Sequence, residues 1–196
     1  MRAEYPLKRP LDIAVSLVGL LLLLLPMAVI ALLMLAIYGR PVFFRHRRPG
    51  LRGRPFTLIK FRTMRRGHEP DAQRMTRLGR FMRATSIDEW PELWNVLKGE
   101  MSLVGPRPLL MAYLDRYAPE EARRHEVRPG ITGWAQVNGR NAIAWEQKFA
   151  HDVWYVDHQS LALDLKILLL TPGKVLQREG INQPGHATAE EFKGGK

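Results

Sequence analysis

The sequence predicts an α+β, mostly helical fold, and three observations lead to that prediction. A long run without charged side chains lies near the amino terminus, two short β-prone runs follow it, and most of the remaining chain has helical patterning. With 196 residues and 46% hydrophobic content, the chain is large enough for one core. We expect an amino-terminal segment at residues 1–39, a compact domain at 40–176 and a carboxyl-terminal tail at 177–196.

The uncharged run extends from Ile13 to Tyr38. As a helix it would be about 38 Å long, which exceeds the roughly 30 Å of a bilayer's hydrocarbon core. A cleaved secretory signal has a shorter apolar region followed by small residues, whereas this run continues directly into Gly39-Arg40-Pro41. We therefore expect a membrane helix that stays in the mature protein.

Basic residues flank this helix on both sides. They are Arg2, Lys8 and Arg9 before it and Arg40, Arg45, Arg47 and Arg48 after it. The positive-inside rule places both flanks in the cytoplasm, which a single span cannot satisfy. Pro26 lies near the middle of the run and favours a bend, so each limb would reach roughly 17 to 20 Å. These observations favour a re-entrant hairpin kinked at Pro26, and a tilted, kinked span is the alternative.

The segment that follows the apolar run predicts a small β-hairpin. Val42-Phe43-Phe44 and Phe56–Ile59 are β-prone, and Pro49-Gly50 supplies turn chemistry between them. The two-residue period of a strand puts Lys60 and Arg62 on one face of this hairpin. They are either solvated strand residues or a pair of cations presented to phosphate.

The sequence Ser86-Ile87-Asp88-Glu89 matches a capping box, with Ser86 as the N-cap of a helix that ends at Lys98-Gly99. Acidic residues at a helix start are favoured by the macrodipole whatever the function. A catalytic role for Asp88 and Glu89 is the alternative. The two roles can coexist, because a helix amino terminus keeps a carboxylate ionised as a nucleophile and attracts phosphate.

Further helices are predicted along the chain. They cover residues 75–83, with Leu78, Phe81 and Met82 inward, and residues 109–117, 119–127, 142–158 and 161–176. Aromatic residues of the later helices belong either to the core or to an interfacial, amphipathic surface on the bilayer. Residues 128–141 are predicted to be irregular, and their glycines at 130, 133 and 139 are either turns or points of close ligand approach. The tail at 177–196 has no periodicity.

The charge distribution restricts the function. The formal net charge is +11, and the segment from Arg40 to Arg83 contains fourteen Lys or Arg residues but only two acids. We therefore expect anionic partners. Nucleic acid, acidic lipid headgroups and phosphorylated small substrates remain open on charge alone. The absence of cysteine excludes a disulfide framework and a Cys nucleophile. A nucleic-acid binder or a lipid-bound adaptor would give no reason for the adjacent acids Asp88 and Glu89, whereas metal-assisted chemistry on an anion would.

Several motifs in order carry a resemblance to a known family. They are Lys60-Phe61-Arg62-Thr63-Met64, Asp88-Glu89, Asn95-Val96-Leu97-Lys98-Gly99, Val104-Gly105-Pro106-Arg107-Pro108 and the segment Arg128–Gln136. Together they resemble the small monotopic bacterial phosphoglycosyl transferases, above all the Campylobacter-type enzymes that initiate N-glycan assembly. The resemblance runs from about Leu7 into the tail.

The resemblance implies transfer of a sugar 1-phosphate from a UDP-sugar to a polyprenyl phosphate, with release of UMP. Asp88 would be the nucleophile of a ping-pong mechanism, and Glu89 would help to hold Mg2+. The residues implied to bind substrates are Lys60, Arg62, Arg83, Pro106, Arg107, Pro108, Arg128, Gln136 and Arg140. Arginine suits this role because its planar fork engages phosphate oxygens bidentately.

The resemblance also implies a location and a substrate class. The protein would be monotopic in the bacterial inner membrane, with its catalytic domain on the cytoplasmic face and in contact with membrane lipids. The sugar would be an N-acetylated amino sugar, and a homodimer stays open. The family often has Ser-Pro at the helix break, whereas this chain has Leu25-Pro26. Asp152 and Asp164 fall in family-like stretches, with capping or salt-bridge roles as the alternative.

Overall fold

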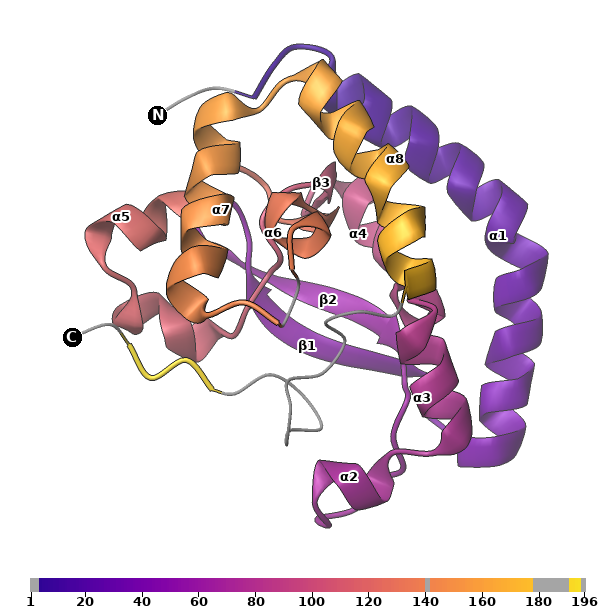
Figure 1. Ribbon diagram of the computed structural model, residues 1–196. Helices are drawn as coiled ribbons and strands as arrows, with labels where there is room; N and C mark the ends of the chain where they lie inside the picture. Colours follow the sequence, from indigo (N-terminus) through magenta and orange to yellow (C-terminus); the bar gives the residue numbers. More distant parts are fainter. Residues whose placement is uncertain (1–3, 140–141, 178–190, 195–196) are drawn as a thin grey trace.

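The computed structural model describes residues 4–139, 142–177 and 191–194, and its elements are shown in Figure 1. The α-helices are α1 (Lys8–Tyr38), α2 (Asp71–Arg74), α3 (Arg77–Ala84), α4 (Glu92–Lys98), α5 (Pro119–Ala122), α6 (Trp134–Val137), α7 (Trp145–His158) and α8 (Leu161–Gln177). The strands are β1 (Phe43–Pro49), β2 (Pro55–Phe61), β3 (Ser102–Val104) and β4 (Gly130–Thr132). Short 3-10 turns lie at Leu51–Gly53, Ile87–Glu89, Met111–Arg116 and Arg123–Glu126. The predicted α+β class is confirmed.

Helix α1 forms the long apolar element that the sequence predicts. It is continuous over 31 residues with Pro26 inside it, and by length and composition it could cross a membrane. Figure 1 shows the helix changing direction about halfway along. Both limbs lie against the rest of the chain. Lys8, Asp12 and Ser16 are buried in the first limb, and Met34 of the second packs in a cluster with Phe61 and Met82.

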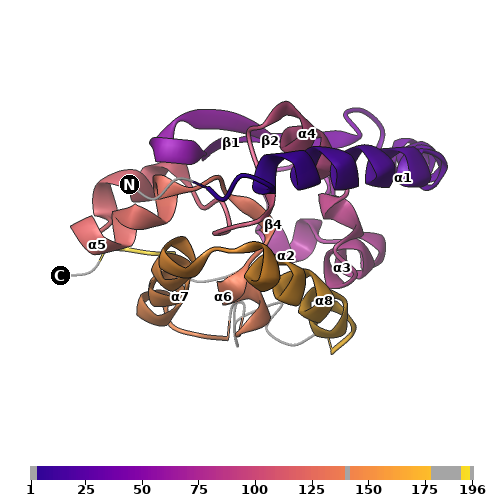
Figure 2. The same cartoon turned by 90° about the horizontal axis from the view of Figure 1, so that it is seen from above.

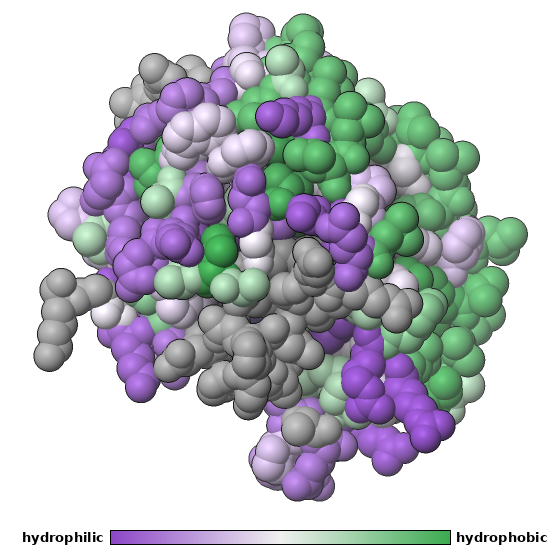
Figure 3. Space-filling model, in the orientation of Figure 1, coloured by the Kyte–Doolittle hydropathy of each residue, from purple (hydrophilic) through white to green (hydrophobic). Residues whose placement is uncertain are grey.

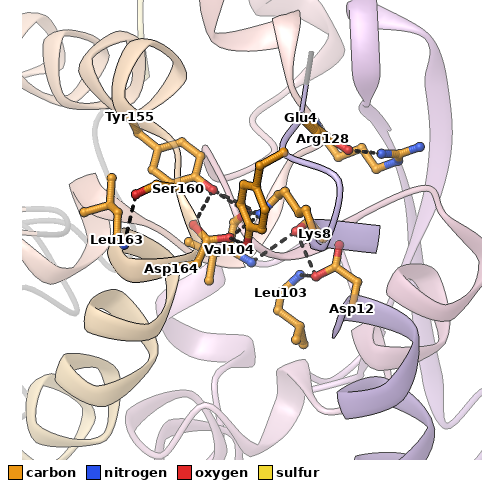
Figure 4. A network of polar contacts seen from close by, with 12 residues as sticks. Glu4, Lys8, Asp12, Leu103, Val104, Arg128, Tyr155, Ser160, Leu163 and Asp164 are labelled. Atoms are coloured by element: carbon orange, nitrogen blue, oxygen red, sulfur yellow. Dashed lines mark hydrogen bonds and ion pairs between the residues drawn. The ribbon is translucent and has the colours of Figure 1, made fainter. Parts of the chain in front are cut away.

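A buried polar network holds the amino-terminal end of α1 (Figure 4). Lys8 Nζ donates to Asp164 Oδ2 at 2.6 Å and to the Val104 carbonyl at 2.9 Å. Asp12 Oδ1 accepts from the hydroxyl of Ser102 and from the backbone N–H of Leu103, both at 3.0 Å. A buried ion pair is tolerated only when its remaining hydrogen bonds are made, so this network fixes α1 against β3 and α8. Asp164 therefore has the salt-bridge role.

The predicted β-hairpin is confirmed and is longer than its β-prone runs. Strands β1 and β2 pair antiparallel, with Phe44 opposite Lys60 and Arg48 opposite Phe56. Arg62 follows β2, is 8% exposed, and donates to the carbonyls of Tyr38 and Gly39 at the end of α1. The hairpin is thereby tied to the second limb of the helix.

A second, parallel pair of strands was not predicted. Ser102 of β3 is in register with Gly130 of β4, and Val104 with Thr132, so the expected irregularity at residues 130–132 is wrong. An added Cβ would lie 2.1 Å from the Gly105 nitrogen at Gly130 and 2.2 Å from the Gly105 oxygen at Gly133. These two glycines permit close approach of backbone to backbone, which brings the segment after β3 against β4.

The hairpin and the carboxyl-terminal helices form opposite outer layers, as the view from above shows (Figure 2). Three local predictions differ from the structure. Phe81 is 52% exposed instead of inward, residues 111–116 form a 3-10 turn, and the helix predicted at 119–127 is divided into α5 and a 3-10 turn. In the tail, Phe192 is buried with Tyr113 and Phe149, so the described end of the chain docks on the domain.

Candidate active site

Asp88 and Glu89 lie on the 3-10 turn Ile87–Glu89, just before α4 begins at Glu92. The expected capping box is wrong. The backbone of Ser86 is in the left-handed helical region, with φ 56° and ψ 18°, and its side chain makes no capping hydrogen bond. The Glu89 carboxylate does not return to the Ser86 backbone, because it is held by cations from two other segments.

Glu89 is the centre of a compact ionic cluster. Its Oε1 accepts hydrogen bonds from Lys60 Nζ at 2.7 Å and from Arg107 Nη2 at 2.6 Å. Burial alone would raise the pKa of Glu89, but Arg107 and Lys60 outweigh it and hold that pKa well below its usual range. Glu89 is therefore ionised at neutral pH and fixes two cations beside its neighbour.

Asp88 is buried, with 7% of its surface exposed, and lines a pocket. Within the described chain its carboxylate accepts no hydrogen bond, in contrast to Glu89. Burial and the charge of Glu89 raise the pKa of Asp88 to about 6, against the opposing charges of Lys60, Arg83 and Arg107. An ionised carboxylate without a hydrogen-bond partner, close to three cations, has the properties of a nucleophile.

A third carboxylate, Glu92, was missed by sequence reasoning. It is 2% exposed, and its Oε1 lies 2.9 Å from Lys60 Nζ, so Lys60 bridges Glu89 and Glu92. Burial raises the pKa of Glu92 to about 7. The three-residue spacing from Glu89, which places both side chains on neighbouring positions of a helical segment, was the available signal.

The pocket has a volume of about 1690 Å3 and is bounded by the hairpin, the 3-10 turn of the acid pair, α6 and α8. Basic side chains outnumber acids in its lining. The basic residues are Arg45, His46, Arg48, Lys60, Arg62, Arg65, Arg66, Arg74, Arg83, Arg107 and Lys148, and the acidic ones are Asp71, Asp88, Glu89, Glu92 and Asp152. Such a cavity is suited to a ligand with more than one phosphate.

The structure brings most of the predicted substrate-binding residues to this pocket, and their roles stay predictions. Lys60, Arg62, Arg83, Arg107, Pro108 and Gln136 line it. Arg83 Nε donates to Thr63 Oγ1 at 2.9 Å.

Three other residues predicted to bind substrate are not among the described residues that line this pocket. Pro106 precedes Arg107 but does not line the main pocket. Arg128 forms an ion pair with Glu4 and donates to the Gly99 carbonyl at 3.0 Å, so it binds the segment just before α1. Arg140 lies outside the described residues.

A buried ion pair between Arg124 and Asp152 holds the backbone of Arg107. Arg124 Nη2 donates to the Arg107 carbonyl at 2.7 Å and to Asp152 Oδ2 at 2.7 Å, and both ion-pair partners are at most 2% exposed. The Arg124 guanidinium also lies over the Tyr117 ring, 5.7 Å from its centroid. Asp152 therefore has the salt-bridge role and acts on the site through Arg124.

Mg2+ is the cofactor that the resemblance implies, and the donor groups fit this ion. Within the described residues, no group of three or more His, Cys, Asp or Glu side chains is arranged to hold a metal ion by itself. Mg2+ does not need such a cage, because one or two carboxylates together with substrate phosphates and water usually hold it. Both hydrogen bonds to Glu89 end on Oε1, which leaves Oε2 for an ion bound with the substrate.

A long apolar helix beside a basic pocket with a carboxylate pair is typical of a membrane-associated protein with an anionic ligand. The chain belongs to the family described as "Bacterial sugar transferase", which matches residues 3–178. This is an enzyme family, and it accounts for the ordered motifs of the sequence.

Relatives support the same family. The chain is 63% identical over 162 residues to the uncharacterized sugar transferase EpsL of Bacillus subtilis, with 80% of each chain covered. It is 42% identical over 186 residues to the UDP-glucose:undecaprenyl-phosphate glucose-1-phosphate transferase of Caulobacter vibrioides, covering 86% of this chain and 69% of that protein. It is 36% identical over 202 residues to the undecaprenyl-phosphate galactose phosphotransferase of Salmonella typhimurium, covering 91% of this chain but 42% of that protein. These relatives do not show a particular closeness to the Campylobacter-type enzymes.

Proposed function

We propose that this protein transfers a sugar 1-phosphate from a UDP-sugar to a polyprenyl phosphate through a covalent intermediate on Asp88. The observation that carries the proposal is the Asp88 carboxylate, which has no hydrogen-bond partner in the described chain and faces a pocket with excess cations beside an apolar helix. The names of the relatives from Caulobacter vibrioides and Salmonella typhimurium support the two substrate classes.

In the first step, an Asp88 carboxylate oxygen attacks the phosphorus that bears the sugar. A new bond forms between that oxygen and phosphorus, and the bond from phosphorus to the bridging oxygen breaks. The electron pair leaves with UMP, so no proton has to move when Asp88 is ionised. The positive charges of Lys60, Arg83 and Arg107 act on Asp88. The same charges would offset the negative charge that develops on the phosphate oxygens.

In the second step, an oxygen of the polyprenyl phosphate attacks the same phosphorus. The bond to Asp88 breaks, the carboxylate is restored, and a polyprenyl diphosphate sugar is formed. Separating the two steps means that a soluble nucleotide sugar and a lipid acceptor need not be aligned at one moment. Mg2+ held by Glu89, when bound, would supply further positive charge to the diphosphate.

The sugar that we propose is an N-acetylated amino sugar, on the basis of the motif resemblance. The relatives from Caulobacter vibrioides and Salmonella typhimurium are named for glucose and galactose, and UDP-glucose and UDP-galactose are therefore the competing donors. Pocket specificity depends on a few polar contacts to the sugar, and a loss of one such contact can change selectivity strongly. A comparison of UMP release from the three donors distinguishes them.

The membrane topology that we propose is re-entrant, with the catalytic domain on the cytoplasmic face. Lys8 at one end of α1 and Met34 near the other are both buried against the domain, whereas a helix of 31 residues crossing the bilayer would separate its ends by about 46 Å. Leu21, Leu22 and Leu25 near the middle are 66–74% exposed. Figure 3 shows hydrophobic surface gathered over the side on which α1 lies.

Helix α8 contributes a second apolar surface to this proposed membrane face. Leu165, Leu169 and Leu176 are 50–81% exposed on it, which is typical of an amphipathic helix resting in the interface. Re-entry of α1 together with such a helix would keep Asp88 close to the lipid headgroups.

The proposed topology predicts one-sided labelling. The chain has no cysteine, so single cysteines at the exposed positions Leu7 and Arg54 report cleanly. We expect both Leu7→Cys and Arg54→Cys to react with an impermeant maleimide only from the cytoplasmic side of membrane vesicles. Labelling of the two positions from opposite sides would exclude the re-entrant arrangement.

The proposed chemistry predicts a half-reaction without lipid. Incubation of the purified protein with Mg2+ and an accepted UDP-sugar, without polyprenyl phosphate, should release about one UMP per protein. Mass spectrometry should find the added mass of one phospho-sugar on the peptide that carries Asp88. UMP release that requires the lipid, with no added mass, would exclude the covalent mechanism.

A further inference from the structure

Lys148 is a buried cation that the sequence reasoning did not consider. It lies in the first turns of α7, is 8% exposed, and lines the pocket. Within the described chain it forms no hydrogen bond or ion pair. Its Nζ lies 4.0 Å from the centroid of the Trp145 ring, which fixes the side chain without neutralising its charge.

Arg48 is a second cation in the same lining, and its side chain is half-buried. It lies on β1, and its Nε is buried without a hydrogen-bond partner within the described residues. Burial lowers the pKa of Lys148 to about 8 and that of Arg48 to about 10. A buried and a half-buried cation without carboxylate partners in the described chain are costly unless an anion binds near them, so these side chains are suited to a phosphate.

Arg107 links these cations electrostatically to the group around Asp88. Arg107 donates to Glu89, and its positive charge adds to burial in lowering the pKa of both Arg48 and Lys148. The pocket thus offers two neighbouring positions for phosphate, which matches a diphosphate.

The hairpin indicates which of the two phosphate positions lies nearer to the membrane helix. Phe61, opposite Phe43, packs in one cluster with Met34 of α1, whereas Arg48 lies five residues further along β1, about 17 Å away. Lys60, next to Asp88, is opposite Phe44 at the α1 end. Only the second limb of α1 lies at the Phe61 end, because Lys8 at the other end of the helix donates to the hydroxyl of Tyr155 in α7 at 3.1 Å. A lipid acceptor would therefore enter at the Phe61 end, beside the second limb of α1, and a soluble nucleotide at the Arg48 end.

We propose that Lys148 and Arg48 form a phosphate subsite that holds the nucleotide-side phosphate of the donor, while Asp88 attacks the phosphate that bears the sugar. This inference rests on the proposed function. The subsite also stabilises the leaving UMP, whose phosphate gains negative charge as the bridging bond breaks.

The test is the binding of UMP to the full chain in nanodiscs, measured by calorimetry with Mg2+ present. Lys148→Met keeps the length and the apolar contact with Trp145 but removes the charge. We expect about 10- to 100-fold weaker binding of UMP, because a hydrogen bond to a charged group is lost, and no change for uridine, which has no phosphate. Lys148→Arg should restore most of the UMP affinity. Lys98→Met, an exposed lysine outside the pocket, is the charge-matched control.

A second variant and a measurement of transfer to the lipid provide further ways to contradict the inference. Arg48→Gln lies on another element and should give the same selective loss, which covers the case in which Lys148→Met does not fold. Unchanged UMP affinity in the folded variants would overturn the subsite. An unchanged UMP affinity with slower transfer from the loaded enzyme to polyprenyl phosphate would assign the cations to the acceptor instead. Failure of the wild type to release UMP from any UDP-sugar would count against the proposed function and not against the subsite.

Discussion

Asp88→Asn should lower UMP release from the UDP-sugar by about three orders of magnitude or more, because an amide cannot replace the carboxylate nucleophile. The substitution keeps the size of the side chain, and the Asp88 carboxylate accepts no hydrogen bond in the described chain, so little structural change is expected. The measurement is UMP release in a single turnover without lipid.

Asp115→Asn is the matched control, because Asp115 is exposed and lies outside the pocket lining. It should keep the wild-type rate and the phospho-sugar adduct. An Asp88→Asn protein that turns over at a rate comparable to the wild type would make the nucleophile assignment wrong, whatever its effect on lipid transfer.

The pH dependence of the wild-type half-reaction gives an independent check on Asp88. Burial and Glu89 raise the pKa of Asp88 to about 6, and only the ionised carboxylate is nucleophilic. The rate should therefore rise about tenfold per pH unit below 6 and become level above it. A first half-reaction that is already independent of pH between 4.5 and 6 would contradict this assignment of the acid limb.

The order of the fold elements could be predicted from the sequence, since apolar length, strand alternation and turn residues act locally. The uncharged run gave α1, and Pro49-Gly50 between two β-prone runs gave the hairpin. The β3–β4 pair could not be predicted, because its two strands have three residues each and are separated by 25 residues of other structure. Local propensity carries no information about which distant backbones meet.

Most of the residues proposed for the site line the pocket as a group, but their contacts could not be predicted. Asp88 and Glu89 stood out because they are adjacent acids after a basic stretch, yet the capping pattern at Ser86 indicated the wrong local structure. The roles of Lys60 and Arg107 as partners of Glu89 depend on tertiary approach. Lys148 gave no sequence signal, because one lysine on a helix is ordinarily a solvated residue.

Glu89→Gln should lower the rate of the first half-reaction by about 10²- to 10³-fold while leaving the protein folded. The amide keeps the shape of the side chain but loses the charge that fixes Lys60 at 2.7 Å and Arg107 at 2.6 Å. Cations that are no longer held in place stabilise a developing phosphate charge less well, and removal of one such electrostatic contact is typically worth this factor. The proposed Mg2+ ligand is lost in the same change.

This substitution has a second consequence that a general loss of structure would not produce. The charge of Glu89 raises the pKa of Asp88, so its removal should lower that pKa and move the acid limb of the rate profile below pH 6. Single-turnover UMP release across pH measures both the rate and the limb. Glu146→Gln, at an exposed position at the start of α7, is the control and should change neither. A slower enzyme with an unmoved acid limb would mean that Glu89 acts through the metal or the fold, and not through the charge it places beside Asp88.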